Sequence, residues 1–280
     1  MTEPTSMAAP HSLSTQIRRD ILEMIYLGGG GHPGGSLSSV EILVCLYFHV
    51  LRLRPDEPAW SERDRFVLSK GHAAPALYAA LARRGYFPVE QLRTFGQPGA
   101  ALQKHPDMQR LPGVELSAGS LGHGLSVAVG MALADRIDRK DRRVYALISD
   151  GESQAAQVWE AAMAAGAFGL DRLIAVTDCN RLQVDGFIDD IMPIRPLEAK
   201  WQSFGWQIQR VDGHDPDALL AAFAAAQETG GRPHMILADT VKGKGVSFIE
   251  NRVEWHSHPL SEEQYRRALA DLAQTDEATA

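Results

Sequence analysis

Residues 144–186 read VYALISDGESQAAQVWEAAMAAGAFGLDRLIAVTDCNRLQVDG. Two apolar runs, at 144–149 and 173–178, flank an alanine-rich stretch with the character of a helix. This order predicts two parallel strands joined by a right-handed crossover helix. Asp150 follows the first strand directly, and Asn180 lies two residues beyond the second. We therefore expect both side chains at the carboxyl edge of the sheet, where open α/β sheets bind ligands.

This edge has the chemistry of a site for a metal ion and a phosphate. A carboxylate and an amide oxygen are hard ligands suited to Mg²⁺ or Ca²⁺, and substrate phosphates usually complete a magnesium site. A helix expected to begin near Glu152 would direct its free N–H groups at the same phosphates. Taken alone, Asp150 also fits a helix cap and Asn180 a turn.

The rest of the chain extends the alternation of strand and helix, which predicts an α/β fold with a mainly parallel, doubly wound sheet. The Gly- and Pro-rich segment 88–116 predicts a long loop with a short helix near 89–95. Further strands are expected over 207–211 and 234–240, and helices over 13–27, 38–50, 74–84, 153–168, 196–204 and 215–227.

Composition excludes several classes of protein. A net charge of −7 over 280 residues argues against a nucleic-acid surface, and no apolar run is long enough to span a membrane. Two distant cysteines, Cys45 and Cys179, do not suggest a disulfide framework, so we expect a cytoplasmic protein. We expect one domain over 12–273, with disordered tails at 1–11 and 274–280.

Four histidines occupy Gly- or Pro-rich turns. They are His32 in GGGGHPGGS, His72 in LSKGHAAP, His105 in LQKHPD and His256 in EWHSHP. Singly, each fits a surface or capping residue, but the shared setting suggests that they converge. Imidazole can accept a proton or donate a hydrogen bond near neutral pH, which suits chemistry on a polyhydroxylated substrate.

The set of motifs resembles transketolases, and specifically the short amino-terminal chains of split transketolases, from about Ile17 to Leu269. The resemblance implies a thiamine-diphosphate-binding fold with thiamine diphosphate and Mg²⁺ (or Ca²⁺) as cofactors. It assigns the metal to the side chains of Asp150 and Asn180 and to the carbonyl of Leu182. In the same pattern Asn180 also belongs to the cofactor site, and the amide of Gly151 holds the diphosphate.

The histidine motifs match the transketolase pattern as well. The match implies that His32 and His256 contact the reacting substrate, that His256 also borders the cofactor, that His72 contacts the diphosphate and that His105 contacts the donor hydroxyls. A second segment, SAGSLGHGLSVAVGMALADR, is a Gly-rich turn leading into a helix. In the family this turn meets the aminopyrimidine ring, which here assigns cofactor contacts to Gly119, Ser120 and Leu121.

The sequence departs from the family pattern in a few places. Ser149 stands where Gly is usual, Cys179 where Asn or Asp is usual, and Lys104 precedes His105 in place of Gly. Ala155 replaces a glutamate that lies near the subunit interface in the family, and Glu160 could take part of its role. Lys244, in TVKGKGVSF, is a possible contact for an anionic ligand, although a solvated lysine is the simpler interpretation.

The resemblance implies transfer of a two-carbon ketol unit from a ketose, typically a ketose phosphate, to an aldehyde. The glutamate that activates the cofactor belongs to a pyrimidine-binding domain, which we expect on a second polypeptide in an α2β2 assembly. Alternatives are a specialised transketolase of secondary or unusual-sugar metabolism, another thiamine enzyme such as deoxyxylulose phosphate synthase or a 2-oxo-acid dehydrogenase α chain, or a catalytically silent homologue.

Overall fold

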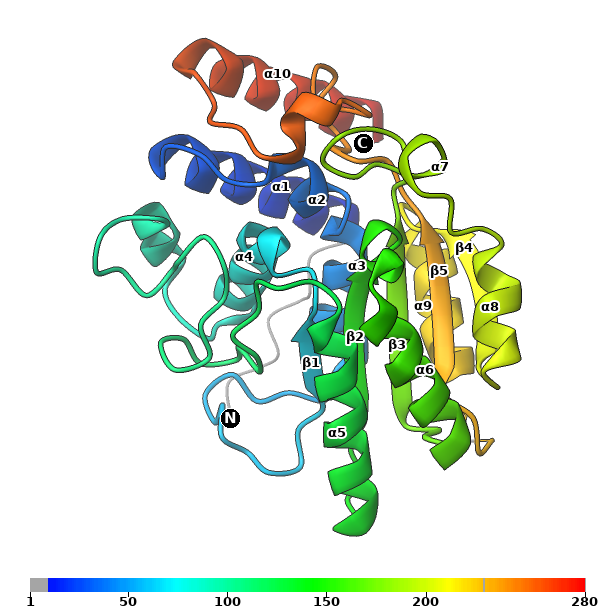
Figure 1. The fold of residues 1–280 in the computed structure, drawn as a ribbon. Coiled ribbons are helices and arrows are strands. Elements are labelled where there is room, and N and C mark those ends of the chain that lie inside the picture. The colour runs from blue at the N-terminus through cyan, green and yellow to red at the C-terminus, as the bar shows by residue number, and fades with distance from the viewer. Residues whose placement is uncertain (1–9, 229, 280) are drawn as a thin grey trace.

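A five-stranded parallel sheet forms the centre of the protein, as a computed structural model shows for residues 10–228 and 230–279 (Figure 1). Neighbouring strands follow the order β1-β2-β3-β5-β4, and each pair is parallel. This confirms the predicted α/β fold with a parallel, doubly wound sheet. The strands are β1 (Arg65–Leu68), β2 (Val144–Ser149), β3 (Leu173–Cys179), β4 (Gln207–Asp212) and β5 (His234–Asp239).

Helices connect the strands and cover the sheet. The α-helices are α1 (Pro10–Leu27), α2 (Pro33–Leu37), α3 (Val40–Cys45), α4 (Ala74–Arg84), α5 (His123–Ile137), α6 (Ala156–Phe168), α7 (Ile188–Ile191), α8 (Leu197–Ser203), α9 (Pro216–Ala226) and α10 (Glu262–Thr279). Short helical turns are the π-helical η1 (Leu46–Val50) and the 3-10 turns η2 (Gly71–Ala73), η3 (Val89–Thr94), η4 (Gly151–Gln154) and η5 (Val253–His256).

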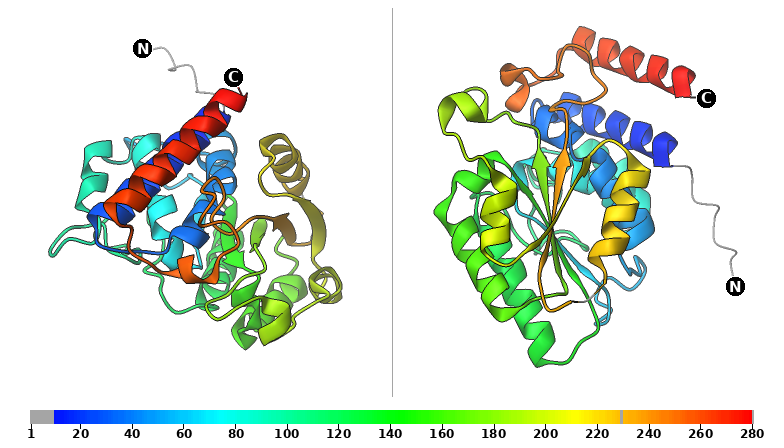
Figure 2. Two further views of the ribbon diagram at one scale, coloured as in Figure 1. Left: turned by 90° about the horizontal axis from the view of Figure 1, so that it is seen from above. Right: turned by 90° about the vertical axis from the view of Figure 1, so that its right-hand side faces the viewer.

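Two hydrophobic cores lie on opposite faces of the sheet, because successive side chains of a strand point to opposite sides. Tyr145 and Leu147 of β2 pack in one core with α1, α3, α4 and α9. Ala146 and Ile148 of the same strand pack in the other core with α5, α6 and α8. Seen along the sheet, the two helical layers lie on either side of it (Figure 2, right). Burial on both faces explains why the strands read as continuous apolar runs.

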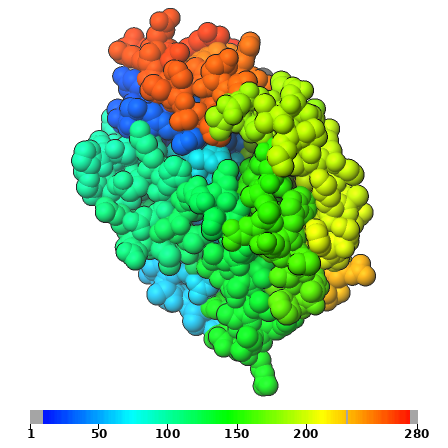
Figure 3. Space-filling model, in the orientation of Figure 1, coloured from blue at the N-terminus to red at the C-terminus, as the bar shows by residue number. Residues whose placement is uncertain are grey.

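Segments distant in sequence meet at the carboxyl edge of the sheet. Helix α10 lies alongside α1 (Figure 1), and the rings of Tyr26 and Tyr265 stack with centroids 4.6 Å apart. The connection from β5 to α10 passes over the loops that follow β1 and β3, and these segments surround a hollow on this side of the molecule (Figure 3). The fold thereby brings together the loops that carry the sequence motifs.

The four predicted strands are present, with ends within one residue of those expected. Three features differ from the expectations based on sequence. β1 was not predicted, the helix expected over 38–50 continues as the π-helical turn η1 after Cys45, and the helix expected over 153–168 is divided. The division falls at Ala155, whose extended backbone (φ −74°, ψ 128°) separates the 3-10 turn η4 from α6.

The ends of the chain also differ from expectation. Residues 1–9 of the expected amino-terminal tail lie outside the described residues, and Pro10 and His11 already belong to α1. At the other end, α10 continues to Thr279, past the expected start of a tail at 274. None of the helices in the described part of the chain combines the length and apolarity needed to cross a membrane.

Candidate active site

Asp150 and Asn180 lie side by side at the ends of β2 and β3, as the sequence predicted. The register pairs Ser149 with Asp178, so the residues that follow occupy neighbouring positions on the edge. Asp150 is 4% exposed and accepts hydrogen bonds from the amides of Gly151 (2.8 Å) and Arg181 (2.6 Å). These bonds hold the carboxylate at the end of its strand.

Leu182 completes the expected ligand group, and its carbonyl is held by a side chain that sequence reasoning did not single out. Arg181 adopts a left-handed backbone conformation (φ 66°), which is rare for a residue with a side chain and is typical of functional sites. The amide of Leu182 donates to Asn180 Oδ1 (3.1 Å). Its carbonyl accepts a hydrogen bond from Lys242 Nζ (3.0 Å), so an ammonium already faces this oxygen.

The donor set fits a magnesium-like ion. Burial, and then the charge of Asp178, raise the pKa of Asp150 to about 7, so its charge lacks full compensation. A cation would supply that compensation. Among the described residues no group of three or more His, Cys, Asp or Glu side chains could hold a metal. One carboxylate, one amide and one carbonyl instead suit a hard cation completed by phosphate oxygens.

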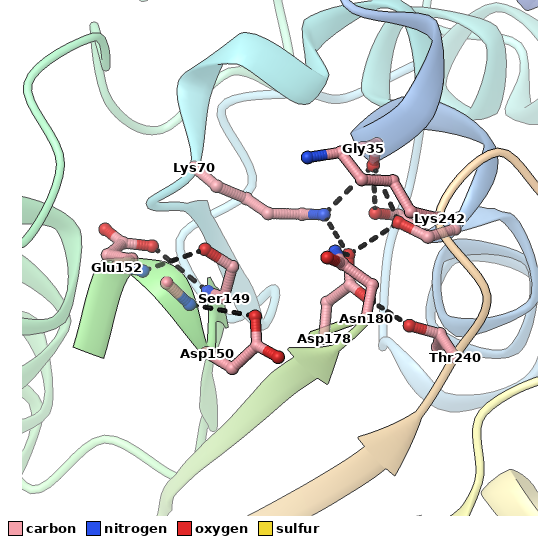
Figure 4. Close-up of polar contacts among 12 residues, drawn as sticks. Gly35, Lys70, Ser149, Asp150, Glu152, Asp178, Asn180, Thr240 and Lys242 are labelled. Atoms are coloured by element: carbon pink, nitrogen blue, oxygen red, sulfur yellow. Dashed lines mark hydrogen bonds and ion pairs between the residues drawn. The ribbon is translucent and has the colours of Figure 1, made fainter. Parts of the chain in front are cut away.

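A second carboxylate, Asp178, is compensated by the protein itself (Figure 4). Asp178 is fully buried, and Lys70 from the KGHAAP motif forms an ion pair with its Oδ2. The hydroxyl groups of Ser38 and Thr240 and the amide of Asn180 also donate to it. Burial acts to raise the pKa of Asp178, but Lys70 and these donors together hold that pKa below its usual value.

Glu152 joins three loops behind the site. Its buried carboxylate accepts hydrogen bonds from the amide of Gly122 (2.7 Å), the amide of Ser149 (3.2 Å) and the hydroxyl of Ser69. The loops after β1, before α5 and after β2 are thus fixed to one another. Ala155 packs against the same turn, since a Cβ built on Gly122 would lie 2.8 Å from the Ala155 Cβ. Glu160 is exposed on α6.

The structure brings the four motif histidines together. The ring centroid of His32 lies 5.4 Å from that of His72, 5.7 Å from that of His105 and 5.5 Å from that of His256. His72 and His256 are 5.3 Å apart and line a cleft together with Asn180, Leu182 and Lys242. His123 lies at the start of α5 and His258 contacts Trp255, outside this group.

Burial favours the neutral form of all four rings. Burial lowers the pKa of His32 to about 4, with further lowering by His105 and Lys242, and it lowers the pKa of His256 to about 3 together with Lys242. Burial also holds the pKa values of His72 and His105 below their usual range. The group can therefore donate and accept hydrogen bonds without carrying charge.

The remaining predicted residues lie at the rim. Leu121 lines the cleft opposite His72 and is 41% exposed, and Gly119 and Ser120 are exposed beside His105. Lys244 does not reach the site, because it lines a separate cleft beside Arg18. Lys242, two residues earlier, is the lysine of TVKGKG that enters the cleft. Sequence reasoning did not single out Lys70, Asp178 or Lys242. Their roles depend on contacts with residues distant in the chain, which the spacing of motifs does not reveal.

Comparison with known proteins places the chain among transketolases. Residues 11–277 match the family "Transketolase, thiamine diphosphate binding domain". A 6-deoxy-6-sulfo-D-fructose transketolase subunit of Clostridium sp. (strain MSTE9) is 51% identical, covering 91% of this chain and 93% of that protein. An apulose-4-phosphate transketolase subunit of Phocaeicola vulgatus is 39% identical, covering 93% and 92%. The solved transketolase of Leishmania mexicana superposes with a TM-score of 0.90 at 30% identity, covering 95% of this chain and 42% of that one.

Proposed function

Because the chain belongs to the transketolase family, in which it matches the thiamine-diphosphate-binding domain, we propose that it is the diphosphate-binding subunit of a two-subunit transketolase. The enzyme would move a two-carbon ketol unit from a ketose, carrying an anionic group such as phosphate, to an aldehyde. The observation that carries this proposal is the convergence of His32, His72, His105 and His256 beside Asp150 and Asn180. The match favours transketolase over the other thiamine enzymes considered from the sequence.

We assign the cofactor end of the site to the edge of the sheet. Asp150, Asn180 and the Leu182 carbonyl would hold Mg²⁺ or Ca²⁺, while the amide of Gly151 and the ring of His72 would contact the diphosphate. When bound, thiamine diphosphate supplies the carbon nucleophile needed to cleave a bond beside a ketone. Gly119, Ser120 and Leu121 would meet the far end of the cofactor at the rim.

The histidines would act on the substrate. A neutral imidazole can take the proton that leaves a donor hydroxyl when the carbon–carbon bond breaks, and return it to the new product. His32 suits this role because its ring lies at the centre of the group, within 5.7 Å of each of the other three rings. His256 and the exposed His105 would orient the hydroxyls of the donor. Catalysis would then proceed with little change in the charge of the cleft.

A second subunit is part of the proposal. Two relatives that match this chain over more than nine tenths of their length are named as transketolase subunits. We propose a partner that carries the pyrimidine-binding domain and its activating glutamate, in an α2β2 enzyme. We also propose a cytoplasmic location. The buried free thiols of Cys45 and Cys179 support it, because free thiols are typical of reducing compartments.

The test of this function is reconstitution. The purified chain, with thiamine diphosphate and Mg²⁺, should show no ketol transfer, and adding the pyrimidine-domain subunit should produce turnover with a suitable donor and aldehyde. The assay measures ketose formation with and without the partner. Robust turnover by the chain alone would refute the two-subunit proposal, and a loaded complex inactive with a broad panel of donors would refute ketol transfer.

A specialised substrate is the second candidate. The relatives from Clostridium and Phocaeicola are named for 6-deoxy-6-sulfo-D-fructose and apulose 4-phosphate, and Ala155 departs from the family pattern. The donor panel should therefore contain sulfonated and branched sugars alongside fructose 6-phosphate. A preference in kcat/KM of more than about tenfold for one of the unusual donors, or about 1.4 kcal/mol, would establish this specialisation.

Magnesium binding should strengthen as pH rises through 7. The folded-state pKa of Asp150 is raised to about 7, so below that pH the carboxyl group keeps a proton that the metal must displace. Between about pH 6 and pH 8 we expect affinity to rise about tenfold, following the ionised fraction. Calorimetry in buffers of different ionisation enthalpy would count the released proton. Magnesium binding to free thiamine diphosphate serves as the control, and a protein affinity that changes no more than this control contradicts the assignment.

A further inference from the structure

Lys242 connects the cofactor edge of the site to the histidine group. Its side chain is 2% exposed, and its ammonium contacts acceptors on two other segments. Nζ lies 3.0 Å from the carbonyl oxygen of Leu182 and 2.9 Å from Nδ1 of His256. The buried carboxylate of Asp178, whose charge also acts on Lys242, is already paired with Lys70. Lys242 is thus directed at the imidazole by the arrangement of its neighbours.

The contact with His256 has a chemical consequence. A protonated Lys242 carries only donors, so Nδ1 of the ring then accepts this hydrogen bond and carries no hydrogen. Burial, and then the charge of Lys70, lower the pKa of Lys242 to about 8, so the lysine is mainly protonated at pH 7. The single hydrogen of the neutral ring then sits on Nε2. We infer that Lys242 is a positioning residue that fixes His256 as the Nε2–H tautomer, so that the ring presents a hydrogen-bond donor to the substrate. This inference deepens the proposed ketol transfer and rests on it for its catalytic meaning.

The glycine-rich first motif makes this approach possible. A Cβ built on Gly34 would lie 2.9 Å from Lys242 Cγ and 2.9 Å from the carbonyl oxygen of Trp255, closer than side chains tolerate. The carbonyl of Gly34 also accepts a hydrogen bond from the amide of Gly243 (3.0 Å). The stem of Lys242 therefore runs along a backbone that lacks a side chain, and the GHPGG and TVKGKG motifs form one packing unit.

The inferred tautomer gives the histidines different roles, hydrogen-bond donation for His256 and proton acceptance for another ring. His256, with its hydrogen on Nε2, is suited to donate to a substrate oxygen and not to remove a proton in the resting state. Proton acceptance then falls to another ring of the group, and the ring of His32 is adjacent to that of His256. The two rings lie 5.5 Å apart, so one substrate could contact both.

The decisive experiment observes the tautomer directly. Long-range ¹H–¹⁵N spectra of the purified chain, with ¹⁵N-labelled histidine, show which ring nitrogen carries the hydrogen, and His256→Gln identifies the signals of interest. The wild type should show His256 as the Nε2–H tautomer. Lys242→Met, which keeps the length of the stem and removes the donor, should yield a mixture or the other tautomer. Lys242→Arg, which retains donors, should restore the wild-type pattern in part.

Lys244→Met is the matched control, because that side chain lies in a different cleft two residues away. Its His256 signals should equal those of the wild type. In the assembled enzyme, Lys242→Met should lower kcat about tenfold or more, the range seen when a group that orients a functional histidine is lost, with a smaller change in KM for the donor.

The two readouts separate this inference from the proposed function. An Nδ1–H tautomer in the wild type, or spectra unchanged by Lys242→Met, would overturn the inference whatever the enzyme does. The expected spectra in an assembly without ketol transfer would leave the positioning role intact and reject the reaction. If Lys242→Met does not fold, the wild-type tautomer and the Lys242→Arg spectra still decide.

Discussion

Replacing Asp150 with alanine should reduce the affinity of the assembled enzyme for thiamine diphosphate in Mg²⁺ by at least about 100-fold, a loss of roughly 2.7 kcal/mol. Asp150 is the only carboxylate in the proposed ligand set, and its removal leaves the charge of the diphosphate poorly neutralised. The amides of Gly151 and Arg181 would lose their acceptor as well. Calorimetric titration of the cofactor at fixed Mg²⁺ measures the change.

Replacing Asp150 should weaken cofactor binding, but it should not lower the stability of the ligand-free protein. Because the pKa of Asp150 is raised from 3.8 to about 7, its ionisation destabilises the fold increasingly as pH rises from about 4 to 7. Asp150→Asn removes this charge with little change in shape. At about pH 8 the ligand-free variant should be at least as stable as the wild type in urea unfolding, although it binds the cofactor weakly. A residue that lowers the stability of the free protein while it strengthens cofactor binding is typical of a functional site.

Asp190→Ala is the control for both measurements. Asp190 is an exposed carboxylate on the neighbouring helix α7, so its loss should change neither cofactor affinity nor stability. If Asp150→Ala binds the cofactor as the wild type does, the metal assignment is wrong. If Asp150→Asn is strongly destabilised without ligands, the carboxylate serves the fold instead of the cofactor.

The elements that sequence predicted well are those whose burial leaves a continuous pattern. β2 and β3 are covered on both faces, and their apolar runs are bounded by polar turns. β1 spans only four residues, directly follows the charged run at 62–64 and occupies an edge of the sheet, so it carried too little pattern to be recognised. Helix α10 was missed because its charged residues hide a narrow apolar stripe that includes Ala268 and Leu272, both buried.

The candidate site divides in the same way. Its histidines and metal-ligand candidates were found because they stand in turns or at strand ends, which local sequence reveals. The paired buried charges were not found, because the two members of a pair can lie far apart in the chain. Lys70 and Asp178, for example, are separated by 108 residues. The sequence could not distinguish Lys242 from Lys244 either, since only the path of the chain decides which of them enters the cleft. Buried polar contacts thus depend on tertiary structure that no motif encodes.

Lys70→Met should destabilise the protein by about 3–5 kcal/mol at pH 7, the range measured when one partner of a buried ion pair is removed. Both side chains are at most 1% exposed, so Asp178 would be left as a charge without compensation. Urea unfolding monitored by circular dichroism measures the difference. The loss should shrink at about pH 5 and below, because Asp178 without its cation has a raised pKa and takes up a proton as pH falls.

Two comparisons test whether the pair itself causes this loss. Lys140→Met removes a lysine from an ion pair with Glu62 that is open to solvent, and it should leave the unfolding midpoint nearly unchanged. The double variant Lys70→Met, Asp178→Asn removes both charges of this pair, so it should recover part of the stability lost by Lys70→Met alone. The double variant could instead lose more unfolding free energy than the two single variants lose together. That result would mean that Lys70 acts through its packing and its bond to the Gly35 carbonyl, and not through Asp178.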